Sequence, residues 1–154
     1  MQRRTFMKGT LAASSVAVAI GAGLLSPRAV LAAWPKSAFE SKSVPDALTN
    51  LYGAAATSPS NDIKIKAPDI AENGAVVPVT VSTSIAGATD IAIIAEKNAS
   101  PLIANFQLKG SAQGFVATRI KMQKTSSVIA VVKAGGKAYS ARKEVKVTIG
   151  GCGG

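Results

Sequence analysis

Residues 128–149 of the chain read VIAVVKAGGKAYSARKEVKVTI, two segments of different apolar pattern on either side of a glycine pair. The first, 128–132, is continuously apolar, as expected for a central strand that is covered on both faces. The second, 139–149, alternates apolar with polar side chains, which is typical of a strand with one face in the core. Gly135–Gly136 between them is a turn signal. The stretch therefore predicts two strands joined by a turn.

The same two patterns recur in the preceding residues. Segments 77–85 and 116–122 alternate, and 91–95 is a second continuously apolar run. Turn signals separate these segments at 73–74, 87, 98–101, 110 and 114. Pro78 has no N–H to donate, which predicts a sheet edge or a bulge there. About seven short strands at this spacing predict a mainly β chain, with an immunoglobulin-like antiparallel β-sandwich over residues 62–149.

Residues 33–61 are the least strand-like part of the chain after residue 32, and we expect a short helix and loops there. Ser43 is a capping residue, Pro45 suits the first turn, and Asp46 stands three residues after the serine. An apolar face follows, and Gly53 is a suitable helix end.

Residues 1–32 have the pattern of a twin-arginine signal peptide. Arg3 and Arg4 precede an uncharged apolar stretch, and small residues follow at 29–33. A membrane anchor is the weaker interpretation, because glycine, serine and threonine interrupt the stretch. We expect cleavage after Ala32 or Ala33 and a periplasmic location. The leader holds four of the 18 basic residues and none of the eight acidic ones, so the mature chain has an expected net charge of +6.

The sequence ends Gly150-Gly151-Cys152-Gly153-Gly154, and Cys152 is its single cysteine. Glycine loses the most backbone freedom on ordering, and this segment offers no side chain to bury in return. We therefore expect residues 150–154 to form a flexible arm that carries the thiol about 10 Å beyond the last strand. Such an arm suits a thiol that other proteins must reach.

The composition argues against catalysis by the chain itself. It has no histidine and no second cysteine, so it lacks a Cys–His pair, the usual zinc or copper ligands, and a haem attachment motif. We expect no metal and no cofactor, and a glycine arm places no cation beside the thiol. The lysines are scattered without interleaved aromatic residues, which argues against nucleic-acid binding and favours small anions or acidic partners. These features predict a non-catalytic covalent carrier.

Two alternatives remain open at this point. An exported structural subunit could use Cys152 for an intermolecular disulfide, in which case a Cys152→Ser variant would not assemble. A redox enzyme could use the lone cysteine, in which case the isolated chain would show thiol-dependent turnover.

The chain resembles the SoxY family, the sulfur-carrier subunits of the thiosulfate-oxidising Sox system. The resemblance covers nearly the whole chain and is carried by the leader and by residues 68–74 with 77–79 (the family's first hairpin), 96–98 with 101, 118–122, and 147–154. It implies a heterodimer with SoxZ, and a thiol at Cys152 that receives thiosulfate from the cytochrome SoxXA as a cysteine S-thiosulfonate. It also implies hydrolysis by SoxB, and oxidation of the remaining sulfur by SoxCD where that protein is present.

Overall fold

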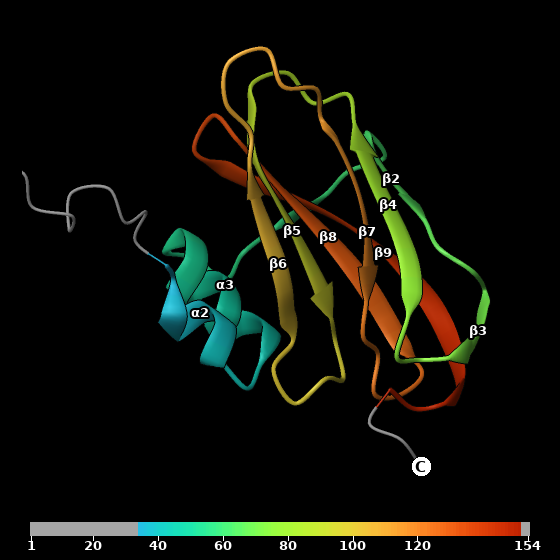
Figure 1. Ribbon diagram of the computed structural model, residues 1–154. Coiled ribbons are helices and arrows are strands. Elements are labelled where there is room, and N and C mark those ends of the chain that lie inside the picture. The colour runs from blue at the N-terminus through green and yellow to red at the C-terminus, as the bar shows by residue number, and fades with distance from the viewer. Residues whose placement is uncertain (1–33, 152–154) are drawn as a thin grey trace, which may run out of the picture. The chain divides into compact units, whose positions relative to one another are not determined.

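The computed structural model describes residues 34–151 (Figure 1). Two helices precede nine strands in this part of the chain. The elements are α2 (Lys36–Glu40), α3 (Val44–Tyr52), β1 (Ser58–Pro59), β2 (Ile63–Lys66), β3 (Ile70–Asn73), β4 (Val77–Thr83), β5 (Ala88–Ala95), β6 (Leu102–Gln107), β7 (Phe115–Ile120), β8 (Ser126–Ala134) and β9 (Lys137–Ile149).

The strands form two sheets. The larger has the order β1-β9-β8-β5-β6, with β3 also pairing β9, and the smaller has the order β2-β4-β7. Most neighbours are antiparallel, whereas the short strands β1 and β3 pair β9 in parallel, through residues 139–140 and 146–149 of that strand. The predicted β-rich sandwich is therefore confirmed, with two parallel pairings that the alternation patterns did not predict.

The two central strands of the larger sheet explain their continuously apolar sequences. One face of β5 and β8 packs against the smaller sheet, through residues such as Ile93 and Val132. The opposite face packs under α2 and α3, where Ile94 and Val131 contact Leu48 and its neighbours (Figure 1). Because both faces are covered, neither strand needs a polar side, and the prediction of central strands is confirmed.

The predicted helix is confirmed as α3. The Ser43 side chain accepts a hydrogen bond from the backbone N–H of Asp46, at 3.2 Å. Gly53 ends the helix with φ of 80° and donates its N–H to the Thr49 carbonyl. A second short helix, α2, precedes it. Among the described residues, none of the helices has the length and apolarity to span a membrane.

Two local expectations need correction. Residues 70–73 and 77–79 do not form a hairpin, because β3 pairs β9 while β4 pairs β2 and β7. β4 is also the middle strand of its sheet rather than an edge strand. Pro78 is tolerated there because the β2 pairing ends at Lys66 opposite Thr80, so the missing N–H interrupts no ladder on that side.

Candidate functional site

The structure describes only some of the predicted site residues. Cys152, Gly153 and Gly154 lie outside the described residues, as do the leader residues Arg3 and Arg4. Gly150 and Gly151 lie inside it, directly after the end of β9. The structure therefore shows the residues to which the cysteine-bearing terminus is attached, which we call its base.

This base is a set of backbone hydrogen bonds that join three segments at the end of β9. The Gly74 N–H donates to the Ile149 carbonyl at 2.8 Å, and the Met122 N–H donates to the Gly74 carbonyl at 2.7 Å. The Gly151 N–H then donates to the Met122 carbonyl at 2.9 Å. We call Gly74, Met122, Gly150 and Gly151 the glycine clasp. It ties the residue before Cys152 to two other parts of the chain.

The glycines of the clasp leave no room for side chains. A methyl group on Gly150 would lie 2.5 Å from the Gln123 carbonyl oxygen, and one on Gly151 would lie 2.7 Å from the Gly74 carbonyl oxygen. Gly151 is buried. The glycine run predicts a flexible arm for both residues, but the structure packs them against neighbouring backbone, because absent side chains permit close approach as well as freedom.

Side chains from two loops hold the Met122 region in place. Asn98 donates through Nδ2 to the Lys121 carbonyl at 2.7 Å and accepts from the Gln123 N–H at 2.9 Å. Gln123 in turn accepts the Ala99 N–H through Oε1 at 2.8 Å. Thr125 Oγ1 accepts the Val147 N–H at 2.8 Å, which ties the same loop to β9. These side-chain hydrogen bonds therefore hold the residues on either side of Met122 in place.

A cationic side chain lies beside the clasp. A methyl group on Gly151 would lie 2.7 Å from Cγ of Lys121, so the stem of this lysine runs along the residue before Cys152. Lys121 is exposed. The sequence predicts no cation at the arm, because Lys121 is 31 positions away from Cys152 and only the fold brings it beside Gly151.

Sequence reasoning missed Gly74 and Met122 as parts of the site. Gly74 was interpreted as half of an Asn-Gly turn signal, and Met122 as the apolar end of a strand. The residue patterns carried no signal that these two would meet the C-terminal glycines, since the contact depends on the parallel pairing of β3 with β9.

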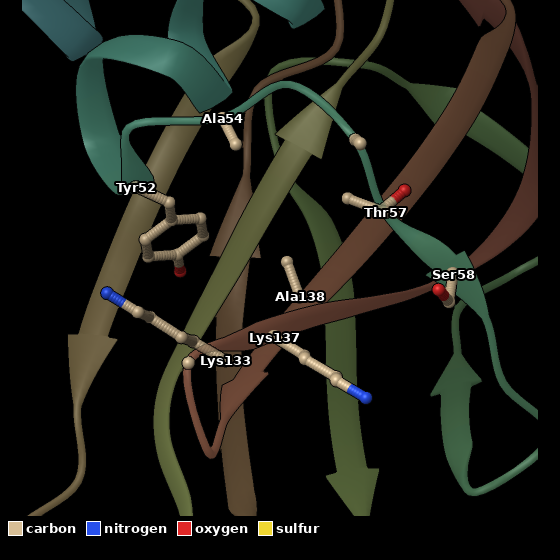
Figure 2. A pocket seen from close by; sticks show the side chains of 9 residues that line it. Tyr52, Ala54, Thr57, Ser58, Lys133, Lys137 and Ala138 are labelled. Atoms are coloured by element: carbon tan, nitrogen blue, oxygen red, sulfur yellow. The ribbon is translucent and has the colours of Figure 1, made fainter.

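A separate cavity lies by the turn between β8 and β9, at the other end of β9 from the clasp (Figure 2). It has a volume of about 220 Å³. Lys133 places its Nζ 5.3 Å from the centre of the Tyr52 ring. The Tyr52 hydroxyl donates a hydrogen bond to Oδ1 of Asn105 at 3.0 Å. Burial, with a smaller contribution from Asp90, raises the pKa of Tyr52 above its usual range. The cavity is distinct from the base of the arm.

Over residues 34–151 the structure contains no group of histidine, cysteine or carboxylate side chains that could bind a metal ion. The fold and the C-terminal segment together define a class: a small β-sandwich protein in which a cysteine follows a clamped glycine pair. Residues 48–152 match the family described as sulfur oxidation protein SoxY, and the chain belongs to that family. This membership supports a sulfur-carrier role.

One solved structure agrees with this assignment. The sulfur carrier protein SoxY from Chlorobium limicola f thiosulfatophilum is 50% identical, with a TM-score of 0.62, over 68% of this chain and 94% of that one. A superoxide reductase (neelaredoxin) from Ignicoccus hospitalis aligns more weakly, at 21% identity and a TM-score of 0.49, over 56% of this chain and 80% of that one. A search of curated proteins finds no match to the chain.

Proposed function

We propose that the chain carries sulfur covalently on Cys152 and presents it to partner enzymes during thiosulfate oxidation. The observation that carries the proposal is that the only cysteine of the sequence directly follows the glycine clasp and lies within the stretch that matches the SoxY family. A thiol in this position is joined to the clamped Gly151 by a single peptide bond, and the carrier role requires that partner proteins reach it.

The chemistry needs an external oxidant for loading and water for release. In loading, the thiol and thiosulfate form a sulfur–sulfur bond and give a cysteine S-thiosulfonate, one proton and two electrons. The electrons pass to a haem partner, for which the family resemblance suggests SoxXA. In release, water cleaves the terminal sulfur–sulfur bond and gives sulfate, a proton and a cysteine persulfide. The chain itself holds the adduct while its partners act on it, as expected for a chain without histidine.

The positive charge beside the clasp supports this role. Thiosulfate is a dianion, and the S-thiosulfonate adduct retains one negative charge. Lys121 places a cationic side chain beside Gly151, and opposite charges favour the approach of an anion.

The proposal extends to location and partners. The twin-arginine pattern at Arg3 and Arg4 supports export to the periplasm in a folded state. The resemblance further supports a heterodimer with SoxZ and transient contacts with SoxXA, SoxB and SoxCD.

Intact-mass analysis of the protein isolated from cells grown on thiosulfate tests the function. We expect adducts on Cys152 with the masses of a thiosulfonate or of added sulfur atoms. A population that carries only disulfides between protein chains would contradict the carrier and support a structural subunit. A Cys152→Ser variant is the control, and it should carry no adduct.

A further inference from the structure

Gly74 occupies a position where the structure needs glycine for space. Its φ is not in the left-handed region, so other residues could adopt its backbone conformation. Glycines in the described loops, such as Gly87 and Gly110, differ in having φ of 72° and 62° and open space around them. Gly74 is instead buried, and its neighbours fill the position that a β-carbon would take.

Those neighbours are the other parts of the clasp. A methyl group on Gly74 would collide with the Met122 carbonyl oxygen, which is the acceptor of the Gly151 N–H. It would also lie 2.8 Å from Cγ1 of Val147 and 3.0 Å from the Gly151 nitrogen. The methyl group would therefore enter the contact that fixes Gly151.

We propose that Gly74 is a positioning residue for sulfur delivery, which fixes the point where the cysteine-bearing terminus leaves the sandwich. The inference rests on the proposed carrier function for its purpose, although the clasp itself does not depend on that chemistry. Gly74 touches neither sulfur nor any reacting atom, and it acts through the Met122 carbonyl and Gly151.

The surroundings determine which part yields when the contact is disturbed. The Met122 side chain is fully buried in the core, and Asn98 bonds the residues on either side of it. Gly151 is held by one backbone hydrogen bond to Met122. A group inserted at Gly74 therefore displaces Gly151 more easily than Met122.

A fixed Gly151 changes how the thiol is delivered. Consecutive Cα atoms are about 3.8 Å apart, so the Cα of Cys152 stays at that distance from a clamped residue. A free arm from the end of β9 would let it range over about 10 Å. A partner enzyme then meets the attachment point at one place on the protein surface, which lowers the entropy lost on docking.

Amide hydrogen exchange of Gly151, followed by NMR on the reduced protein, tests the clasp directly. In the wild type we expect exchange at least about tenfold slower than in an unstructured chain. Gly74→Ala should accelerate it at least about fivefold more than the control Gly114→Ala does. Gly114 is a matched control, because a methyl group there would lie 2.6 Å from Cγ2 of Thr83 and 2.7 Å from its carbonyl oxygen, at the other end of β7.

Exchange of Gly151 at the unstructured rate in the wild type would overturn the inference, as would equal acceleration by the two variants. If Gly74→Ala does not fold, Gly150→Ala takes its place, because its methyl group would meet the Gln123 carbonyl oxygen at 2.5 Å, one residue from each partner of the Gly151–Met122 hydrogen bond. It too should accelerate exchange of Gly151 more than Gly114→Ala does.

The positioning role is tested by thiosulfate loading of Cys152 by the haem partner. We expect Gly74→Ala to raise the KM for the carrier about threefold or more with little change in kcat, and Gly114→Ala to change neither. An unchanged KM in Gly74→Ala would overturn the role. If the wild type cannot be loaded at all, the proposed function fails, whereas the exchange experiment still decides the clasp.

Discussion

The two ends of β9 both rely on glycine, for opposite reasons. At the turn before the strand, Gly135 and Gly136 have φ of 56° and 75°, and a side chain at either would meet open space. At the clasp after the strand, Gly74 and Gly151 have φ outside the left-handed region, and a side chain at either would meet backbone atoms. The first pair provides backbone conformation and the second provides space, so the same residue type carries two different structural requirements.

The glycines at the turn serve to reverse the chain between β8 and β9, whereas those at the clasp hold the residue that precedes Cys152. The turn end lies beside the cavity that contains Tyr52 and Lys133, while the clasp end leads to Cys152. We therefore expect substitutions at the clasp end to change sulfur carriage, and comparable substitutions at the turn end to change stability alone.

The largest effect is expected for Cys152→Ser. Sulfur loading should be lost completely, because serine offers no sulfur to join to thiosulfate, while the melting temperature should stay that of the reduced wild type. Mass spectrometry and thermal unfolding measure the two quantities. Residual sulfur on the serine variant would show that the attachment point lies elsewhere.

Met122→Ala should follow, with about 2–5 kcal/mol less stability in urea unfolding, because it removes a fully buried side chain. Leu48→Ala, between the helices and the larger sheet, should be similarly costly and is the matched control. Only the Met122 variant should deprotect the Gly151 amide by local opening. Equal deprotection in both variants would remove the distinction between the clasp and the rest of the core.

Gly74→Ala should lower the free energy of unfolding by about 1–3 kcal/mol, the usual range for overpacking. Gly135→Ala should cost about 1 kcal/mol, since alanine only has to adopt a left-handed conformation in open space. Replacing Gly135 with Asn, which tolerates that conformation, should recover part of the loss, whereas Gly74→Asn should be worse than Gly74→Ala. The same ranking at both positions would contradict the two-role interpretation.

The smallest effect is expected for Lys133→Met, which removes the cation from the Tyr52 ring. The loss should be about 0.5–1 kcal/mol, as for a partly exposed cation–π contact. Thiosulfate loading of Cys152 should be unchanged, because Lys133 lies at the turn end of β8. A reduced loading rate would show that the cavity takes part in sulfur carriage, and would contradict the separate roles of the turn end and the clasp end of β9.

The sequence predicted the parts of the fold that local patterns determine. Ser43 and Gly53 bound a helix because capping acts within a few residues, and β5 and β8 were recognisable as central strands because both of their faces are apolar. β6 was missed, since Leu102–Gln107 alternates poorly and includes Asn105. The pairing of β3 was predicted wrongly, because a neighbouring segment is the default partner, whereas Ile70 pairs with Lys146, 76 residues further along.

The candidate site shows the same division. Cys152 stands out from composition alone, as the only cysteine of a chain without histidine. The role of Gly150 and Gly151 is not evident from composition, because the sequence of a glycine run does not show whether the run is flexible or packed. What decides between them is the nearness of Gly74 and Met122, which is a property of the tertiary pairing.

The parallel pairing of β1 and β3 with β9 has a consequence for the order of folding. Both short strands pair only with β9 among the described elements, at residues 139–140 and 146–149. Neither can pair until that strand has been synthesised, so these contacts are among the most distant along the chain and are slow to form. The early strands must therefore wait, unpaired, for the last one. The strand that completes the larger sheet is also the one that leads to Cys152. Completion of the sheet therefore falls within three residues of the synthesis of the cysteine.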